Sequence, residues 1–359
     1  MSTATSTMTR VIVEAFGGIE QLKVVEAPLP QPGPGLVRVR VTSIGMNHAD
    51  LMARVGQYRI SSGDPPFTPG LEAGGVIDAL GEGVTDRRVG QRVVIGPDAP
   101  RRAAAGAGAS AAAGGGTYTS HYVCLASQTY LAPDVLPDEQ LGAIWLGYLT
   151  AWGCLVWKHH LKPGQIVAMP AASSNVALAA AQIVKHLGGT AIGLTTSPGK
   201  VDTLKQLDTS AFDHIVVTHG PDRQPLPWHK DLKDITEGRG LRGVDVFFDP
   251  VAAGAYLETE IRSMAQHGTI YVYGLLGEPG KVDVTPLIRK HGAIAGWAMA
   301  ELVAAGREAF EPGCRHILEG FAKGTYRQHV DRVFKLADVR EAQAYMEEGK
   351  HIGKLVLVP

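Results

Sequence analysis

Polar side chains that can bind phosphate gather at two places in the middle of the chain. Each group directly follows a short apolar run, at residues 165–170 in one case and 190–194 in the other. The first group is Ser173, Ser174 and Asn175, together with the backbone N–H of Val176, and the second is Thr195, Thr196, Ser197 and Lys200. Hydroxyl groups, backbone N–H groups at a helix start and a lysine ammonium all bind phosphate well.

The pattern around these residues predicts the elements that position them. Pro163 and Gly164 precede the first apolar run, which therefore indicates a buried strand. Apolar residues recur at helical spacing from Val176 to Leu187 and stop at Gly188, and residues 190–194 then predict a second strand. Strand, small-residue turn, helix and strand form the unit that places a dinucleotide pyrophosphate on a helix N-terminus. We therefore expect a nicotinamide-dependent oxidoreductase.

The turn before this helix departs from the glycine fingerprint G-x-G-x-x-G. Ser174, Asn175 and Ala177 stand where that fingerprint has glycine. We expect Asn175 to tolerate the positive φ that glycine would allow, and Ala177 to permit close packing of helix on strand. Taken alone, the same turn also fits an ordinary βαβ unit that binds no nucleotide.

The end of the second strand bears on which dinucleotide binds. Sites that prefer NAD usually carry an acid there, which binds the ribose hydroxyls and repels a 2′-phosphate. No Asp or Glu occurs between Thr190 and Val201, whereas Lys200 supplies a positive charge. We therefore expect NADPH as the cofactor. The alternative is that Lys200 is a solvated lysine at a helix start.

The composition excludes several classes of protein. The 359 residues carry a formal net charge of −1, which gives no electrostatic basis for binding nucleic acid or an anionic membrane. Hydrophobic residues make up 45% and charged residues 19%, as in a globular enzyme with a sizeable core. No apolar run approaches the ~20 residues that span a bilayer. The Ser/Thr-rich start lacks an apolar signal segment, so we expect a cytoplasmic protein.

Two kinds of pattern divide the chain. Residues 10–95 contain short alternating runs separated by Gly and Pro, which predicts a compact β-barrel-like domain. From Asp138 onward, an apolar helix over 141–157 leads into the alternating strands and helices of a doubly wound parallel sheet. Its later strands are expected at 214–217, 244–248 and 269–273, while those at 332–334 and 354–358 return to the first domain. The predicted fold is α/β, with one domain over 1–135 plus 325–359 and the other over 136–324.

Two features have no assigned chemistry. Residues 99–116 are mostly Ala and Gly, which predicts a flexible loop. The cysteines Cys124, Cys154 and Cys314 form no C-x-x-C pair and are too few for a four-cysteine zinc site. We expect them to be small buried hydrophobic residues.

Several segments together closely resemble the medium-chain dehydrogenase/reductase superfamily, from about Arg10 to Pro359. Their order and spacing carry the resemblance. They are 34–41, 45–51 (G-M-N-H-A-D-L), 69–76 (P-G-L-E-A-G-G-V), 150–152 (T-A-W), 245–251, 273–274 (Y-G) and 353–357 (G-K-L-V-L). The resemblance implies a GroES-like β-barrel catalytic domain, an inserted Rossmann domain with its doubly wound parallel sheet, and an active site in the cleft between them.

The superfamily contains zinc alcohol dehydrogenases and zinc-free quinone or enoyl reductases. Catalytic zinc needs three protein ligands and an open fourth position. Asn47 and Leu71 stand where the zinc branch has Cys and His, and Ala49 replaces its proton-relaying hydroxyl residue. We therefore expect no metal site. The N-x-x-D segment at 47–50, followed by G-x-Y at 56–58, resembles the zinc-free branch of quinone and enoyl thioester reductases.

The resemblance also implies roles for single residues. Tyr58 is implied as the proton donor, because hydride addition to an enone or enoyl ester builds an enolate that needs a hydrogen-bond donor and then a proton. Asn47 is implied beside the nicotinamide ribose or the substrate carbonyl. The other residues implied near the cofactor are Thr150, Val251, Gly274 and Lys354.

The sequence thus indicates a zinc-independent reductase that transfers hydride from NADPH to an activated C=C bond of a quinone, an enone or an enoyl thioester. We expect a small apolar unsaturated carbonyl substrate, and a homodimer joined at the Rossmann sheet edge over 294–299. Two alternatives stay open. One is an alcohol or carbonyl dehydrogenase of the same superfamily, and the other is a catalytically silent NADPH-binding sensor protein.

Overall fold

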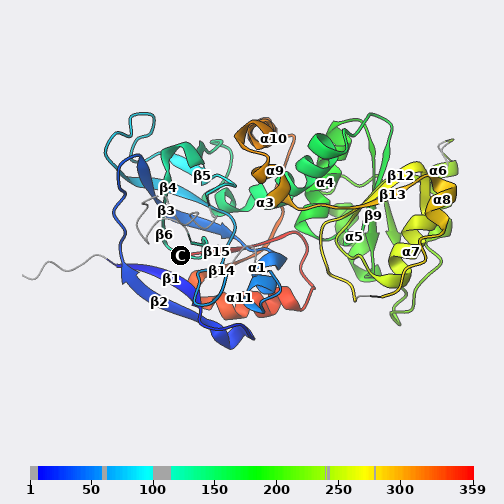
Figure 1. The fold of residues 1–359 in the computed structure, drawn as a ribbon, viewed down its shortest axis with the longest axis horizontal. Helices are drawn as coiled ribbons and strands as arrows, with labels where there is room; N and C mark the ends of the chain where they lie inside the picture. Colours follow the sequence, from blue (N-terminus) through cyan, green and yellow to red (C-terminus); the bar gives the residue numbers. More distant parts are fainter. Residues whose placement is uncertain (1–6, 59–62, 100–114, 239, 241–242, 279) are drawn as a thin grey trace, which may run out of the picture. The chain divides into compact units, whose positions relative to one another are not determined.

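The computed structural model describes residues 7–58, 63–99, 115–238, 240, 243–278 and 280–359 (Figure 1). The chain divides into two compact units. The β-rich unit comprises Met1–Leu146, Leu318–Gly324 and Gln328–Pro359, and the α/β unit comprises Gly147–Ile317 and Thr325–Arg327. The stretch expected to be a flexible loop at 99–116 falls outside the described residues at 100–114.

The β-rich unit is made mostly of antiparallel strands. Its strands are β1 (Thr7–Val13), β2 (Leu22–Pro28), β3 (Leu36–Gly45), β4 (Ala73–Leu80), β5 (Arg92–Ile95), β6 (His121–Leu125), β7 (Thr129–Leu131), β14 (Val330–Lys335) and β15 (Lys354–Val358). Its helices are α1 (His48–Arg54), α11 (Val339–Glu347) and the 3-10 turns η1 (Ile19–Gln21), η2 (Ala126–Gln128), η3 (Asp138–Ala143) and η6 (Leu336–Asp338).

A single long strand, β3, organises this unit. In the described residues the main sheet has the order β14-β15-β3-β4-β5-β7, and β6 also pairs with β3. The C-terminal strand β15 runs antiparallel to β3, with Val356 opposite Gly45. On its other side β3 pairs with β4, with Ile44 opposite Ala73. The pairing therefore brings the end of β3, the start of β4 and the C-terminal strand together.

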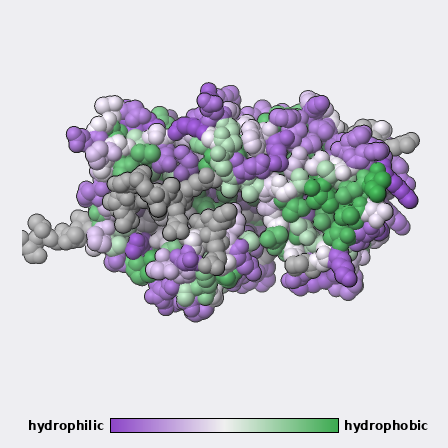
Figure 2. Space-filling view, in the orientation of Figure 1, coloured by the Kyte–Doolittle hydropathy of each residue, from purple (hydrophilic) through white to green (hydrophobic). Residues whose placement is uncertain are grey.

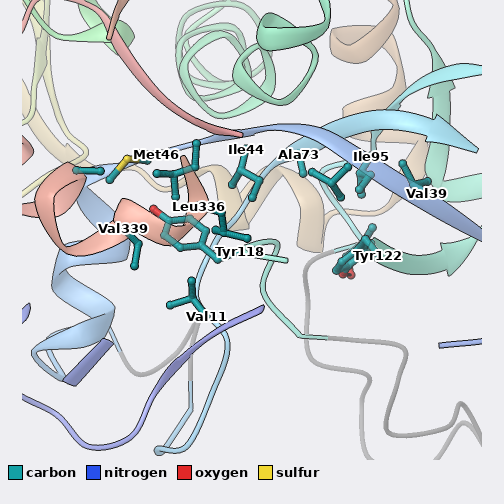
Figure 3. Close-up of a cluster of buried hydrophobic side chains, with 14 of the residues drawn as sticks. Val11, Val39, Ile44, Met46, Ala73, Ile95, Tyr118, Tyr122, Leu336 and Val339 are labelled. Carbon is teal, nitrogen blue, oxygen red and sulfur yellow. Dashed lines mark hydrogen bonds between the residues drawn. The ribbon is translucent and has the colours of Figure 1, made fainter. Parts of the chain in front are cut away.

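Apolar side chains from these strands meet in one core. Figure 3 shows part of it, in which the ring of Tyr118 lies among Val11, Leu336 and Val339. Tyr118 is completely buried, like Val39 on β3. Outside this core, α11 is tied to α1 by a hydrogen bond from the Arg54 side chain to Gln343 at 2.9 Å.

Within its described residues, the α/β unit is a six-stranded parallel sheet with helices on both faces. Its strands are β8 (Ile166–Met169), β9 (Thr190–Thr195), β10 (His214–Val217), β11 (Val244–Asp249), β12 (Met264–Val272) and β13 (Ala293–Gly296). Its helices are α3 (Trp145–Trp152, begun in the β-rich unit), the π-helix η4 (Gly153–Lys158), α4 (Asn175–His186), η5 (Pro198–Lys200), α5 (Val201–Gln206), α6 (His229–Glu237), α7 (Gly254–Ser263), α8 (Pro286–Lys290), α9 (Met299–Ala304) and α10 (Arg307–Ala322, which ends in the β-rich unit).

The strand order reverses at the middle of this sheet. The order is β10-β9-β8-β11-β12-β13, and each neighbouring pair is parallel. All residues of β8 and β9 are buried, as expected of strands covered on both faces. Figure 1 shows α4 and α5 on one side of the strands and α6 and α7 on the other. Open sheets of this kind bind ligands beyond the carboxyl ends of the strands where the order reverses, here between β8 and β11.

The predicted fold class is confirmed: the chain is α/β, with a GroES-like β-barrel unit and a Rossmann unit. The single helix expected over 141–157 is wrong, because the chain passes there from 3-10 turn to α-helix to π-helix. The His159 N–H bonds to Cys154 O, five residues back. A Cβ on Gly153 would lie 2.6 Å from the ring of Trp297, so the π-helix begins where that ring packs on bare backbone.

All three cysteines are buried and none of them forms a disulfide, as expected of small hydrophobic residues. Among the described residues, no helix combines the length and the apolar character needed to cross a membrane.

Candidate active site

The turn between β8 and α4 is held by Ser174. This residue is the N-cap of α4, and its Oγ accepts the backbone N–H of Ala177 at 3.2 Å. A capping hydroxyl satisfies only one of the N–H groups that a helix start leaves without backbone partners. The rest, together with the positive end of a 12-residue helix, favour an anion. Ser173, Asn175 and Val176 are half-buried on the same turn, as a ligand-contacting surface requires.

The expectation that Asn175 takes a positive φ is wrong. The left-handed residue of this turn is Ala171, at φ +54°, and Asn175 is the first residue of α4. Asn175 fits because its side chain lies against the backbone of Gly147, where any Cβ would collide with the amide. Ala177 is completely buried, so the small side chain at the third fingerprint position does allow the helix to pack closely.

Lys200, which follows β9, contacts the same turn. The Lys200 Nζ donates a hydrogen bond to Ser173 Oγ at 3.2 Å. Thr195 is buried and its Oγ1 accepts the Ser197 N–H at 3.1 Å, so this hydroxyl shapes the turn. Thr196 is exposed and Ser197 half-buried. The structure thus brings Lys200 of the second predicted phosphate-binding group into contact with Ser173 of the first.

Two further predicted residues lie on adjoining loops at the carboxyl edge of the sheet. Val251 follows β11, and its carbonyl accepts the Gly277 N–H at 3.0 Å. Gly274 follows β12, and a Cβ there would lie 2.9 Å from Pro250 O. Thr150 is buried on α3, where its carbonyl accepts the Trp297 indole N–H at 2.8 Å. Val251 and Gly274 therefore belong to one packed pair of loops.

Asn47 belongs to the β-rich unit, where it links β3 to α1. Its amide is fully engaged: Nδ2 donates to Gly45 O at 3.1 Å and to Glu72 Oε1 at 3.0 Å, while Oδ1 accepts from Lys354 Nζ at 2.7 Å. The sheet register explains this meeting, because Gly45 pairs with β15 and Ile44 with the start of β4. Side chains at 47, 72 and 354 therefore come together from three distant parts of the sequence.

Lys354 and Glu72 form a buried ion pair at this meeting point. Lys354 Nζ bonds to Glu72 Oε1, and both side chains are 1% exposed. The other carboxylate oxygen of Glu72 accepts the N–H groups of Trp145 and Leu146, each at 2.9 Å, at the start of α3. A Cβ on Gly45 would collide with Glu72, so the network needs glycine there. The structure thus places Lys354, predicted as a cofactor contact, inside a network that already uses its ammonium.

A second buried acid adjoins this network. Asp50 Oδ2 accepts the Asn47 N–H at 2.9 Å and the Tyr118 hydroxyl at 3.0 Å. Burial raises the pKa of Asp50 to about 7, and the positive charge of Lys354 partly opposes that rise. Burial and the Asp50 carboxylate together raise the pKa of Tyr118 well above its ordinary value. This phenol therefore stays protonated and donates to Asp50.

Tyr58 lies in the turn that follows α1 and is half-buried. Among the described residues, its hydroxyl makes no hydrogen bond. The sequence reasoning missed Glu72 as a site residue. Its signal was a single acid inside the run P-G-L-E-A-G-G-V, directly after the apolar Leu71.

The donor set around Asn47 does not suit zinc. Across the described part of the chain, no three His, Cys, Asp or Glu side chains are grouped so that they could hold a metal ion. Of the two acids at this point, Asp50 already accepts the Asn47 N–H and the Tyr118 hydroxyl, and Glu72 is paired with the Lys354 ammonium. A cation placed beside that ammonium would be repelled.

Comparisons with known proteins agree with this architecture. The family "Alcohol dehydrogenase GroES-like domain" matches residues 33–134, and the family "Zinc-binding dehydrogenase" matches residues 228–357. The synaptic vesicle membrane protein VAT-1 homolog of Rattus norvegicus is 28% identical, over 97% of this chain and 83% of its own. A 2-haloacrylate reductase from a Burkholderia species is 26% identical over 97% and 98%, respectively. The quinone oxidoreductase of Sus scrofa is 25% identical over the full length of both chains.

Solved structures match over the same extent. An NAD-dependent alcohol dehydrogenase is 29% identical with a TM-score of 0.82, covering 98% of this chain and 99% of its own. The quinone oxidoreductase of Escherichia coli, solved with NADPH, is 25% identical with a TM-score of 0.80, covering 98% and 100%. Matches of this length include both units and their order along the chain. The matching families and relatives therefore support a place for this chain in the medium-chain dehydrogenase/reductase superfamily, in its quinone oxidoreductase branch.

Proposed function

We propose that this chain is an NADPH-dependent reductase that adds hydride to an activated C=C bond, in a quinone, an enone or an enoyl thioester, without zinc. The observation that carries the proposal is the Lys200 ammonium, 3.2 Å from Ser173 on the turn before α4. A cation at the end of β9 favours a 2′-phosphate, and no acid stands there to repel it. The relatives named 2-haloacrylate reductase and quinone oxidoreductase support an electron-poor double bond or quinone as the acceptor.

The α/β unit offers a fitting cradle for the dinucleotide. The N-terminus of α4 and the Ser173 and Ser174 hydroxyls would hold the pyrophosphate. Lys200, Thr196 and Ser197 would hold the 2′-phosphate at the end of β9. Val251, Gly274 and Thr150 are assigned to the nicotinamide end. Bound NADPH supplies the hydride.

The β-rich unit supplies the proposed acid. Hydride addition leaves negative charge on the substrate oxygen, which a neighbouring hydrogen-bond donor stabilises. Tyr58 is assigned to this role, since its hydroxyl is not engaged by another described residue. The Asn47 amide has both of its N–H groups occupied, so it would have to release Gly45 or Glu72 to contact the substrate. We therefore assign Asn47 chiefly to holding Glu72 and Lys354.

One rival function is favoured by a specific observation. The solved NAD-dependent alcohol dehydrogenase resembles this chain as closely as the NADPH-bound quinone oxidoreductase does. On that basis the chain would be an alcohol or carbonyl dehydrogenase. The absence of an acid after β9 and the ammonium paired with Glu72 weigh against NAD and against zinc, respectively.

A substrate panel with metal analysis separates these functions. NADPH oxidation is followed by absorbance with quinones, enones and crotonyl-CoA, and with aldehydes and ketones as the comparison. Turnover of the C=C acceptors by metal-free protein is the expected result. Stoichiometric zinc with alcohol oxidation would establish the rival instead. Tight NADPH binding without turnover of any acceptor would identify a sensor and refute the reductase.

We also propose that the protein is a homodimer joined along β13, the edge strand of the parallel sheet. Figure 2 shows apolar side chains gathered over the part of the α/β unit where Figure 1 places β12, β13 and α8. Ile288 is 76% exposed and Val284 53% exposed there. Light scattering should give twice the chain mass, and Ile288→Glu should give a monomer. Leu131→Glu, at a similarly exposed apolar residue in the other unit, should leave the dimer intact. A monomeric wild-type protein would refute this assembly.

A further inference from the structure

A buried arginine ends the helix that precedes Tyr58. Arg54 is the last residue of α1, and its side chain is 3% exposed although it carries a full positive charge. Burying a charge is costly unless hydrogen bonds and an opposite charge compensate for the lost water. Each of the three guanidinium nitrogens has an acceptor among the described residues. These acceptors therefore identify what Arg54 holds in place.

The acceptors come from two segments that are distant in the sequence. In the loop between β1 and β2, Gly17 O accepts a hydrogen bond from Arg54 Nε at 3.1 Å. On α11, Gln343 Oε1 accepts one from Nη1 at 2.9 Å, and Glu347 Oε1 accepts one from Nη2. Figure 1 shows α11 beside α1. A guanidinium group holds its donors in a rigid plane, so this side chain fixes α1, the loop and α11 relative to one another.

The same loop packs against the turn that leads to Tyr58. The Gly17 N–H donates to Arg54 O at 3.2 Å, so the loop and the end of α1 exchange two hydrogen bonds. Gly56, in the turn after α1, has φ +82°, and a Cβ there would lie 3.1 Å from Cγ of Phe16. The bare backbone of this turn therefore packs on the ring of Phe16, directly before the residue that Arg54 holds.

Backbone hydrogen bonds define the path of the chain from α1 to Tyr58. The Gly56 N–H bonds to Ala53 O at 3.1 Å, and the Gln57 N–H bonds to Met52 O at 2.8 Å. Both acceptors belong to the last turn of α1, so a displacement of that helix end displaces the turn with it. Tyr58 is the next residue along the chain and moves with the turn.

We propose that Arg54 is a positioning residue for the proton-donating step: it fixes the end of α1 on the loop and on α11, and thereby sets the position of the Tyr58 hydroxyl. The inference rests on the proposed function, because it takes Tyr58 as the acid. Arg54 itself is buried and contacts neither cofactor nor substrate. An acid must lie within hydrogen-bond reach of the group that it protonates, and a misplacement of about 1 Å can cost roughly 100-fold in rate.

Substitutions of Arg54 should therefore slow turnover without weakening nucleotide binding. Arg54→Met removes all three side-chain bonds, and we expect kcat for a C=C acceptor to fall roughly 10- to 50-fold. This loss stays below that of Tyr58→Phe because Arg54 acts only through Tyr58. The Kd for NADPH should stay within about twofold, since the proposed dinucleotide cradle lies in the α/β unit.

Arg54→Lys keeps a positive charge beside Glu347, so this variant is expected to fold even where Arg54→Met does not. Its single ammonium group cannot reach both Gly17 O and the two acceptors on α11. We therefore expect kcat to fall by about fivefold or more in this variant as well, again with an unchanged Kd for NADPH.

The Tyr58→Phe background separates positioning from a general structural role. Where the hydroxyl of Tyr58 is already absent, Arg54→Met should change kcat by less than about twofold. A role in overall folding would lower the rate by the same factor in both backgrounds. Arg38→Met is the matched control, because Arg38 is also buried in the β-rich unit and bonds to Asp78 at 2.8 Å and to Pro30 O at 2.9 Å. It should lower the melting temperature but leave kcat within about twofold.

Amide hydrogen exchange tests the inference without turnover. In the nucleotide-free protein, the N–H groups of Gly56 and Gln57 should exchange faster in Arg54→Met than in wild type, and at the wild-type rate in Arg38→Met. For whichever Arg54 variant folds, normal exchange at these amides, a full kcat, or equal kcat losses with and without the Tyr58 hydroxyl would each overturn the inference and leave the proposed function standing.

Two other outcomes reach further. A full kcat in Tyr58→Phe would overturn the choice of acid, and the positioning role of Arg54 with it. A wild-type protein that reduces no C=C acceptor would overturn the proposed function and this inference together.

Discussion

The hydroxyl of Tyr58 carries the acid step of the proposed mechanism. Tyr58→Phe removes that proton donor and keeps the ring, so kcat for a C=C acceptor should fall roughly 100-fold or more. The Kd for NADPH should stay unchanged, because the loss affects only the step after hydride transfer begins. Stopped-flow and steady-state NADPH absorbance measure both quantities. Tyr345→Phe is the control, since that phenol donates instead to Asp331 at 2.9 Å. A full kcat in Tyr58→Phe would remove this residue from the mechanism.

The proposed preference of the protein for NADPH over NADH rests on the charge of Lys200. Lys200→Ala should weaken NADPH binding by about 10- to 100-fold, the loss expected for a hydrogen bond between charged groups, and NADH binding by less than about twofold. Lys205→Ala removes an exposed lysine from the adjacent helix α5 and should affect neither nucleotide. Fluorescence titration with both nucleotides gives the comparison. Equal losses for NADPH and NADH would show that Lys200 does not recognise the 2′-phosphate.

The start of α3 is held by Glu72, whose charge is balanced by Lys354 near the C-terminus. Glu72 accepts two N–H groups of that helix start and pairs with Lys354 on β15, with both side chains 1% exposed. Lys354→Met leaves an uncompensated buried carboxylate and should lower the free energy of unfolding by about 3–5 kcal/mol. Glu72→Gln in the same protein should recover much of that loss, because the remaining charge is gone.

Thermal unfolding of the single and double variants measures this coupling. The Glu72→Gln variant by itself leaves a buried ammonium and should also be less stable than wild type. If the double variant were as unstable as the sum of the two single variants, the ion pair would not be the unit that supports α3.

Local pattern was enough to predict several elements from the sequence. The apolar runs and glycines around β8, α4 and β9 are contiguous, and each element was predicted within a residue or two of its observed bounds. The helix over 141–157 could not be predicted in detail, because its start depends on Glu72 and its π-helical end on the ring of Trp297. Both partners lie far away in the sequence. The positive φ was assigned to Asn175 by residue type, whereas the strand exit places it at Ala171.

Part of the candidate site could likewise be predicted from the sequence. Ser173 was predicted at the pyrophosphate and Lys200 at the 2′-phosphate, and the structure places the two side chains in hydrogen-bond contact. Lys354 was associated with the cofactor, yet strand pairing between β15 and β3 carries it to Glu72 and Asn47. That register depends on the whole β-rich sheet.

At the scale of the whole molecule, the buried Asp50 should make stability depend on pH. Its pKa rises from an ordinary value of 3.8 to about 7 on folding, chiefly because of burial. Between these values the folded protein binds a proton that the unfolded chain has lost, so stability falls as pH rises. The contribution of Asp50 is therefore fully present below about pH 4 and is lost as pH rises through 7. Each pKa unit of this difference changes the free energy of unfolding by about 1.4 kcal/mol.

Asp50→Asn isolates this contribution, because asparagine still offers an oxygen to the Asn47 N–H and the Tyr118 hydroxyl. Other shifted groups, such as Glu260 in the other unit and His48 on α1, titrate in both proteins and so cancel in the comparison. The melting temperature of the variant relative to wild type should therefore rise steadily from pH 4.5 to pH 8. Calorimetry across that range measures it. If the difference between the two melting temperatures stayed the same at every pH, Asp50 would already be ionised in the folded protein. The network around Lys354 would then accommodate its charge.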